Sequence, residues 1–216
     1  MQRAPRPRLI LASRSRDKAG EIREILEPVL HADIVTLDDA GIQEIDAEEN
    51  IEVHETFLAN AHAKAEWFMR ITGQPTLADD SGISVHALSG APGVRSRRFA
   101  GTPGLAGVAQ DRANNERLLR ELRDTPDELR TAHYTCAAVL HLPDGRRFSA
   151  IGTCAGRILH DPQGTAGFGY DPLFFVPALG HSFGEATREQ KHRHSHRARA
   201  FRALAGAVPA RALTAD

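Results

Sequence analysis

The sequence predicts an α/β protein from three features. A short apolar run at residues 8–12 leads into a polar loop and then into a helical pattern. Apolar side chains recur at helical spacing from residue 56 to residue 71. Residues 131–142 and 147–154 have the pattern of two long strands joined by a turn that contains Asp-Gly, which is typical of a hairpin. Strands and helices therefore both contribute to the expected fold.

Length and composition indicate a globular protein. Of its 216 residues, 41% are hydrophobic and 25% are charged, which are ordinary globular values. No apolar run is long enough to span a bilayer, and residues 1–7 lead into too short an apolar run for a signal peptide. Cys136 and Cys154 lie in no metal or redox spacing, which favours a reducing compartment. We therefore expect a cytoplasmic protein with a flexible tail at residues 1–7.

The charge balance argues against a polyanionic partner. The net charge is −1, from 27 basic and 28 acidic residues, so the overall electrostatic footprint of a nucleic-acid binder is missing. Basic residues gather locally, mainly at 95–98 and 188–202. Local clusters without global charge suit a small anionic ligand, and we expect neither a nucleic acid nor a membrane as partner.

The loop after the first strand has the composition of a phosphate site. Ser13 and Ser15 supply hydroxyls and Lys18 an ammonium group, just before a helix whose apolar residues resume at Ile22. A helix N-terminus offers unpaired N–H groups and the positive end of the helix dipole. The alternative is that Ser15 or Asp17 simply caps the helix.

An acidic segment at residues 38–55 has little periodicity and is expected to form a solvated loop.

The helix expected over 56–71 faces the core through residues at helical spacing, and Trp67 is expected to have a packing role. Its apolar positions are Phe57, Leu58, Ala61, Ala65, Phe68 and Met69.

Two aspartates follow the apolar pair Leu77-Ala78 and precede Ser81-Gly82, a pattern that predicts a strand end and then a turn. Adjacent strand residues point to opposite faces, so one of Asp79 and Asp80 can face a cleft while the other anchors the turn. Such a carboxylate suits Mg²⁺, which usually binds one or two carboxylates plus substrate phosphates. A turn capped by Asp and Ser is the alternative.

A glycine-rich loop at residues 164–172 precedes the apolar strand expected at 173–176. Glycines allow a close approach of backbone to ligand, and Phe168 or Tyr170 could stack on a base. Aromatic side chains that pack into the core are the alternative.

Residues 83–123 lie between the two aspartates and the glycine-rich loop. They are expected to supply a strand and a helix of the scaffold.

The last informative segment is residues 187–197, before a helix-compatible pattern that ends near Ala205. Ser195 has the position of an N-cap, and the cations that follow would oppose the helix dipole unless an anion binds there. Zinc binding by His192, His194 and His196 is not favoured, because alternate residues share a face only in a strand.

Four blocks of this sequence resemble the motifs of the inosine triphosphatase family, the non-canonical purine nucleoside triphosphate pyrophosphatases. They occur in the family's order and reach from Leu9 to Arg197. Ser15 stands where most members have Asn, and Ala59 where many have Glu. The matching residues are Ser13 and Lys18, Ala78-Asp79-Asp80-Ser81-Gly82 with Gly90-Ala91-Pro92-Gly93-Val94 and Ser96-x-Arg98-Phe99-Ala100-Gly101, Gly167-Phe168-Gly169-Tyr170-Asp171-Pro172, and Lys191 with Ser195-His196-Arg197.

The resemblance implies a fold and an assembly. The expected fold is an elongated mixed α/β sheet with flanking helices, forming two lobes around a central cleft. The expected domain is 8–205, with a C-terminal tail at 206–216, and the expected assembly is a homodimer.

The resemblance also implies Mg²⁺-dependent hydrolysis of ITP, dITP and XTP to the monophosphate and pyrophosphate. Asp80 would activate water and hold Mg²⁺ with support from Asp79, and Glu44 would be a second metal ligand. Phe168 would stack on the purine, while His196 and Arg197 would donate to its 6-oxo group. The implied substrate-binding residues are Ser13, Arg14, Ser15, Lys18, Ser81, Phe168, Gly169, Tyr170, Asp171, Lys191, His196 and Arg197.

Two alternatives stay open. Maf-type nucleotide pyrophosphatases also begin with a strand and Ala-Ser-x-Ser, as in Ala12-Ser13-Arg14-Ser15, although their Pro-Arg-Arg continuation is absent. A non-catalytic nucleotide-binding module is the other alternative, which the departures at Ser15 and Ala59 allow.

Overall fold

The computed structural model describes residues 6–213. The chain divides into two compact units, here called the first and the second unit. The first comprises Met1–Asp80, Cys136–Gly152 and Arg197–Asp216, and the second comprises Ser81–Thr135 and Thr153–His196. Each unit is described by itself.

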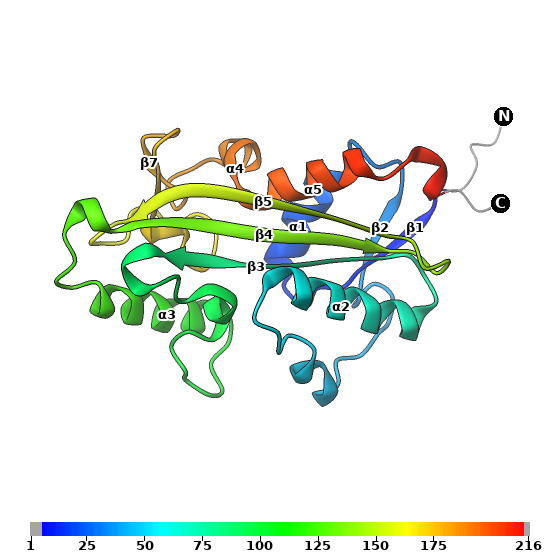
Figure 1. Ribbon diagram of the computed structural model, residues 1–216, viewed down its shortest axis with the longest axis horizontal. Coiled ribbons are helices and arrows are strands. Elements are labelled where there is room, and N and C mark those ends of the chain that lie inside the picture. The colour runs from blue at the N-terminus through cyan, green and yellow to red at the C-terminus, as the bar shows by residue number, and fades with distance from the viewer. Residues whose placement is uncertain (1–5, 214–216) are drawn as a thin grey trace. The chain divides into compact units, whose positions relative to one another are not determined.

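Within residues 6–213 the strands form a seven-stranded sheet in the order β2-β1-β3-β4-β5-β6-β7 (Figure 1). Strand β1 is parallel to β2 and β3, whereas β6 is antiparallel to β5 and β7. The predicted mixed sheet is confirmed, and the cleft between two lobes stays a prediction. The strands are β1 (Arg8–Leu11), β2 (Asp33–Thr36), β3 (Thr76–Val85), β4 (Thr131–His141), β5 (Arg147–Ile158), β6 (Phe174–Val176) and β7 (His181–Ser182).

The helices agree with the sequence pattern at α1, α2, α3 and α5. No helix within the described part of the chain is long and apolar enough to cross a membrane. The predicted tails lie partly outside the described residues, at 1–5 and 214–216, and the last helical turn covers Ala210–Ala212. The α-helices are α1 (Arg16–Leu26), α2 (Phe57–Thr72), α3 (Gly107–Glu121), α4 (Arg188–His194) and α5 (His196–Ala207).

In the first unit, alternate residues of β1 pack on opposite faces of the sheet. Leu9 and Leu11 join a cluster with apolar side chains of α1 and α5, whereas Ile10 joins a cluster with those of α2. Because side chains alternate along a strand, α1 and α5 cover one face and α2 covers the other (Figure 1).

Strand β3 continues this alternation into the two aspartates. Leu77 packs in the cluster with α1 and α5, and Ala78 packs in the cluster with α2. Asp79 and Asp80 therefore face opposite sides of the sheet, as predicted. The turn expected at Ser81-Gly82 is wrong, because β3 runs unbroken to Val85.

The glycine at position 82 reflects close packing in place of a turn. A Cβ atom there would lie 2.6 Å from the carbonyl oxygen of Gly93 and 2.3 Å from Oγ of Ser96. Gly93 and Ser96 together leave room only for a hydrogen atom at this position.

Side chains cap α1 and α2 of the first unit. Ser15 Oγ accepts the N–H of Lys18 at 3.3 Å, and Thr56 Oγ1 accepts the N–H of Ala59 at 3.2 Å. Gly73 ends α2 in the left-handed conformation, with φ at 65°. The capping alternative for Ser15 is therefore confirmed.

Residues 188–207 form two helices where the sequence analysis expected one. Thr187 and Gln190 make a reciprocal capping box at the start of α4, with bonds of 3.2 and 2.8 Å. Ser195 is extended and directly precedes α5. The sequence analysis missed α4 because Arg188–His194 contains no apolar residue from which a helical period could be read.

The second unit packs around aromatic side chains. The rings of Tyr134 and Phe174 meet edge to face with centroids 4.6 Å apart, and Phe174 stacks on Phe183 at 5.6 Å. These rings share a buried cluster with Ile83 of β3 and Leu118 of α3. This core supports the glycine-rich loop and the start of β6.

Arg130 ties three chain segments of the second unit together. Its buried guanidinium donates to the carbonyl oxygens of Leu122, Ile158 and Leu159 at 2.7, 2.9 and 2.9 Å. Burial lowers the pKa of Arg130. Loss of this side chain would remove hydrogen bonds from buried carbonyl groups, although that of Leu122 also accepts the N–H of Thr125 at 3.0 Å.

We expect Arg130→Met to lower the free energy of unfolding by about 3 kcal/mol, since it leaves buried carbonyl groups unpaired. Urea titration measures the change. The matched control is Arg123→Met at an exposed arginine, with an expected change within about 0.5 kcal/mol. A similar loss for both variants would contradict the structural role of Arg130.

A histidine pair lies in the first unit. Nε2 of His141 is 2.8 Å from Nδ1 of His62, and Nδ1 of His141 is 3.4 Å from Glu66, which also pairs with Arg147 at 2.8 Å. Burial, followed by the neighbouring His62 and Arg147, lowers the pKa of His141 to about 4. Burial also lowers the pKa of His62. Both rings are therefore neutral at pH 7.

The free energy of unfolding is expected to fall as the pH drops from about 6.5, the usual pKa of His, towards 4. In this window the unfolded chain binds more protons than the folded chain, which favours unfolding. His141→Gln removes the titrating ring and should flatten the fall, measured by urea titration at several pH values. His31→Gln, at an exposed position, is the control and should keep the wild-type slope. An unchanged slope in His141→Gln would refute the prediction.

Candidate active site

Asp79 is a fully buried carboxylate held by two cations of the first unit. Its Oδ2 lies 3.4 Å from Nζ of Lys18 and 3.7 Å from Nε of Arg197. The thiol of Cys136 donates to the same oxygen at 3.9 Å, and burial together with Asp79 raises the pKa of that thiol. A carboxylate removed from water requires such partners. Asp79 therefore links β3 to α1 and α5, and the supporting catalytic role expected for it stays a prediction.

Asp80 is also buried, but its surroundings differ. Burial raises the pKa of Asp80, and the negative charge of Glu52 raises it further. The charges of Lys18 and Lys64 oppose this rise, as does a hydrogen bond from Asn60. A raised pKa makes this carboxylate a stronger base than an ordinary aspartate, as activation of water requires.

Asn60 on α2 holds Asp80 in a defined orientation. Its Nδ2 donates to Oδ2 of Asp80 at 2.9 Å, while its Oδ1 accepts the N–H of His54 at 2.8 Å. The second contact fixes which end of the amide faces Asp80, because only the nitrogen can donate.

Glu52 and Lys64 form an ion pair beside the two aspartates. Burial raises the pKa of Glu52, but the charges of Lys64 and Lys18 outweigh it and the pKa falls. Burial likewise lowers the pKa of Lys64, but Glu52 and Asp79 outweigh it and the pKa rises. Both groups are therefore charged at neutral pH. Their charges also act on Asp80.

The loop between β1 and α1 presents the predicted hydroxyl groups. Ser13 Oγ accepts the N–H of Ser15 at 3.3 Å, and Ser15 in turn caps α1. Both side chains are half-buried, and Lys18 reaches Asp79 from the first turn of α1. A phosphate contact by these residues stays a prediction.

Arg14 points into the acidic segment. Its guanidinium binds both carboxylate oxygens of Glu48, at 2.6 and 3.0 Å, and the carbonyl oxygen of Ile42 at 2.8 Å. This bidentate pair raises the pKa of Arg14 against the effect of burial, and exposed Glu44 adds to the rise. Arg14 thus holds the acidic loop, and Glu52, rather than Glu44, is the glutamate whose charge acts on Asp80.

Arg197 is engaged within the first unit. Its guanidinium pairs with Glu21 of α1 and approaches Asp79, and its side chain is buried. Burial alone would lower the pKa of Arg197, but Glu21 and Asp79 raise it. The contacts show Arg197 holding α5 to α1 and β3, and the predicted contact with a base stays a prediction.

In the second unit, Asp171 organises the glycine-rich loop. Its Oδ2 accepts hydrogen bonds from Nζ of Lys191 at 2.6 Å and from the N–H of Phe168 at 3.0 Å. Its Oδ1 accepts a hydrogen bond from the hydroxyl of Tyr134 at 3.5 Å. Gly167 has φ at 75°, and a Cβ there would lie 2.1 Å from Oδ2 of Asp171. The glycine is therefore needed both for its backbone conformation and for space.

The ring of Phe168 is half-buried and lies 4.5 Å from the ammonium of Lys191, as a cation–π pair. The next residue anchors the loop to α3. Gly169 donates its N–H to Asp111 at 2.7 Å, and its carbonyl oxygen accepts from Asn115 at 3.0 Å. Phe168 is thus presented by a loop whose backbone is fixed on both sides of the ring.

Tyr170 serves packing. Its buried hydroxyl donates to the carbonyl oxygen of Ser96 at 2.8 Å, and burial raises the pKa of Tyr170. Ser96 Oγ accepts the N–H of Ile83 at 2.9 Å. The alternative that an aromatic side chain of this loop tucks into the core is confirmed for Tyr170.

His196 opens α5 and is buried, with 4% of its surface exposed. Its ring stacks on Tyr134, with centroids 4.5 Å apart and an angle of 6° between the planes. The predicted residues thus fall into two groups, one per unit. The peptide bonds Asp80–Ser81 and His196–Arg197 join these units within the motifs themselves.

The donor set fits the implied Mg²⁺. Asp80 and Glu52 offer carboxylate oxygens, and the burial that raises the pKa of Asp80 makes a compensating cation favourable. Within residues 6–213 no group of three or more His, Cys, Asp or Glu side chains is arranged to hold a metal ion. Mg²⁺ usually takes several of its ligands from water and substrate oxygens.

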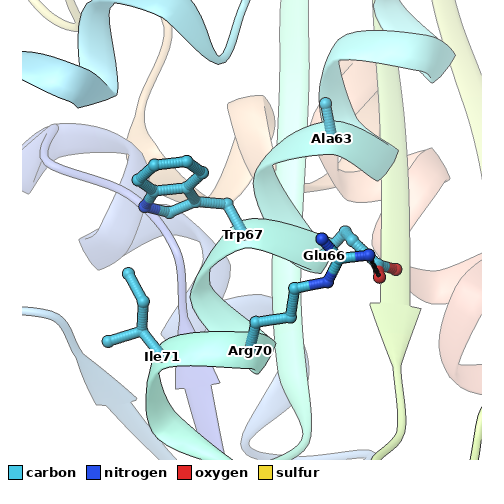
Figure 2. Close-up of a pocket in the computed structure, with 5 residues that line it drawn as sticks. All are labelled: Ala63, Glu66, Trp67, Arg70 and Ile71. Carbon is cyan, nitrogen blue, oxygen red and sulfur yellow. Dashed lines mark ion pairs between the residues drawn. The ribbon is translucent and has the colours of Figure 1, made fainter.

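A hollow of about 400 Å³ on α2 lies apart from these residues (Figure 2). Figure 2 shows Trp67 and Ile71 on one side of it and the ion pair of Glu66 with Arg70 on the other. The hollow is lined by none of the predicted site residues. Trp67 is half-buried, in agreement with the packing role predicted for it.

A family model described as the Ham1 family matches residues 9–207. The chain belongs to the Ham1 family. A relative from Ralstonia nicotianae named dITP/XTP pyrophosphatase is 44% identical, over 91% of this chain and 94% of the relative.

Two solved structures are similar to this chain. A HAM1 protein from Coxiella burnetii has a TM-score of 0.79 and 32% identity, covering 93% of this chain and 98% of the other. A nucleoside-triphosphatase, dITP/XTP pyrophosphatase, from Mycobacterium abscessus has a TM-score of 0.70 and 36% identity, covering 94% and 99%.

Sequence reasoning assigned no site role to three polar residues near Asp80 in this Ham1 chain. Asn60 and Lys64 are one helical turn apart, and that spacing on a helix otherwise expected to be apolar was the available signal. Glu52 was one of eight acidic residues in a loop without periodicity, so only the structure distinguishes it.

Gly167→Ala is expected to lower the free energy of unfolding of this Ham1 protein by about 3 kcal/mol, because the strained backbone adds to a collision with Asp171. The control is Gly169→Ala, which also has positive φ, at 64°, but meets nothing within 4 Å. Its expected loss is about 1 kcal/mol by urea titration. Equal losses would argue against close packing at Gly167.

Proposed function

We propose that this chain hydrolyses the non-canonical purine nucleoside triphosphates ITP, dITP and XTP to the monophosphate and pyrophosphate. The observation that carries the proposal is the buried carboxylate of Asp80, which Asn60 orients through a hydrogen bond of 2.9 Å and on which the charges of Lys18 and Lys64 act. A basic carboxylate among cations suits the attack of water on a phosphoanhydride. The relatives named dITP/XTP pyrophosphatase support the purine class.

In this reaction Asp80 orients a water molecule and accepts its proton. The water oxygen bonds to the α-phosphorus, the bond from that phosphorus to the oxygen bridging towards the β-phosphorus breaks, and pyrophosphate leaves. Lys18 and Lys64 offset the negative charge of the phosphates, while Asp79 holds Lys18 in place. The hydroxyls of Ser13, Ser15 and Ser81 are the proposed further phosphate donors.

Mg²⁺ is the proposed cofactor, with Asp80 and Glu52 as its protein ligands. When bound, it would neutralise charge that develops on the phosphates. Glu52 is preferred to Glu44 because its charge acts on Asp80, whereas Glu44 is exposed in the loop held by Arg14.

The second unit supplies the proposed base recognition. Phe168 stacks on the purine, and His196 donates towards the 6-oxo group. Lys191 and Asp171 hold Phe168, with Gly169 and Tyr170 anchoring the loop. Arg197, which also approaches Asp79, is the second proposed donor to the 6-oxo group. Adenine presents a donor at position 6, so the buried donor would be left unpaired, a mismatch worth roughly 10⁴-fold in discrimination.

Family membership weakens the Maf-type alternative, whose substrates are pyrimidine nucleotides. A homodimer, a cytoplasmic location and the lack of nucleic-acid or membrane partners are also part of the proposal. A non-catalytic nucleotide-binding module would bind ITP without turnover, and the experiment below separates it from an enzyme.

Asp80→Asn is expected to lower the rate of pyrophosphate release from ITP and XTP by at least about 100-fold, because the proton acceptor is lost. Wild-type enzyme should act on ITP and XTP far better than on ATP or dTTP, and only with Mg²⁺. Asp144→Asn, in the exposed hairpin turn, is the control and should keep full activity. Turnover confined to dTTP, or binding of ITP without turnover, would reject the proposal.

Substitutions of Glu52 and Glu44 test which of the two glutamates binds Mg²⁺. We expect Glu52→Gln to raise the Mg²⁺ concentration for half-maximal rate by at least about tenfold, since a carboxylate ligand is lost. Glu44→Gln should leave that concentration unchanged. The opposite result would restore Glu44 as the metal ligand.

A further inference from the structure

Tyr134 of β4 lies among the residues that the proposed function assigns to the base. It is buried, with 7% of its surface exposed, and its ring packs edge to face against Phe174. It belongs to none of the sequence motifs described above. Its contacts nevertheless connect it to His196 and to Asp171.

The contact with His196 is a parallel stack. The two ring planes differ by 6°, and the centroids are 4.5 Å apart. An imidazole donates only in the plane of its ring, so the orientation of that plane decides where its N–H groups point. The broad torsion that turns an imidazole about its bond to Cβ has no strong preference of its own. A flat ring packed against it restricts that torsion.

The contact with Asp171 reaches the other half of the base site. The hydroxyl of Tyr134 donates to Oδ1 at 3.5 Å, while Oδ2 of the same carboxylate holds Lys191 and the backbone of Phe168. This hydrogen bond is long, whereas the stack on His196 is close and flat. The ring of Tyr134 therefore makes the stronger of its two contacts with these residues.

We propose that Tyr134 is a positioning residue for base selection, which fixes the plane of the His196 imidazole through its own ring so that the N–H of His196 is aimed at the 6-oxo group. The proposal rests on the proposed function, because it needs His196 to recognise the base. Tyr134 itself makes no contact with the substrate in this proposal.

The first test compares Tyr134→Leu with Tyr134→Phe. Pyrophosphate release gives kcat and KM for ITP and for ATP. Tyr134→Leu removes the ring and should lower the ratio of kcat/KM for ITP to that for ATP by about 2- to 10-fold, the range that aromatic pairs support. The loss should appear as a higher KM for ITP at unchanged kcat, because a contact with the base is equal in ground and transition states. Tyr134→Phe keeps the ring and should keep the wild-type ratio.

The ratio is independent of the amount of folded enzyme, because both substrates are measured on one preparation. Tyr134→Met is the second variant should Tyr134→Leu fold poorly, since a flexible side chain fills the space more easily. Leu118→Ala is the control, because Leu118 of α3 is buried in the same cluster but has no ring. It should reduce thermal stability and leave the ratio unchanged.

A double-mutant cycle tests whether Tyr134 acts through His196. In a His196→Ala background, Tyr134→Leu should have no further effect on the ratio. A wild-type ratio in Tyr134→Leu, an equal fall in Tyr134→Phe, or a full effect without His196 would each overturn this proposal alone. Wild-type enzyme that released no pyrophosphate from ITP would overturn the proposed function and, with it, this proposal.

Discussion

The buried charge of Asp79 is the constraint on which the first unit depends. A carboxylate without exposed surface is tolerated only with close cations, and Lys18 and Arg197 supply them from α1 and α5. Arg197 is buried in turn and pairs with Glu21. The charged side chains of this network therefore join α1 and α5 to β3. Substitution of one of them would leave another charge of the network with a lost partner. The same network sets the position of Lys18 beside Asp80.

The second unit also contains a buried carboxylate that pairs with a cation, but with different partners. Asp171 is buried and pairs with buried Lys191, and its remaining acceptor capacity goes to the backbone of Phe168 and the hydroxyl of Tyr134. An aromatic ring in a glycine-rich loop would otherwise be poorly fixed. The carboxylate converts the loop into a support for that ring, and Gly167 is the residue whose small size allows the carboxylate to come so close.

The sequence predicted the helix and strand types well, because apolar periodicity reports directly on burial. It failed where a residue type had two explanations. Gly82 suggested a turn, but the glycine makes room for a close backbone in an unbroken strand. The motifs pointed to Asp79 and Asp80, yet which carboxylate is anchored by cations and which has the raised pKa depends on α1, α2 and α5 packing on β3. Glu52 could not be singled out, since its pairing with Lys64 joins a loop without period to a helix.

The chemistry of the two units differs in a way that bears on selectivity. The first unit presents charges, among them Lys18, Lys64 and Asp80, which suit phosphates and a metal ion. Phosphates are common to all nucleoside triphosphates, so these charges cannot tell one base from another. The second unit presents flat rings, Phe168 and His196, each held by a buried neighbour. In the proposed function, discrimination among purines therefore comes from the residues that meet the base, among them Phe168 and His196, and a change at Lys18 or Lys64 should alter the turnover of every nucleotide by a similar factor.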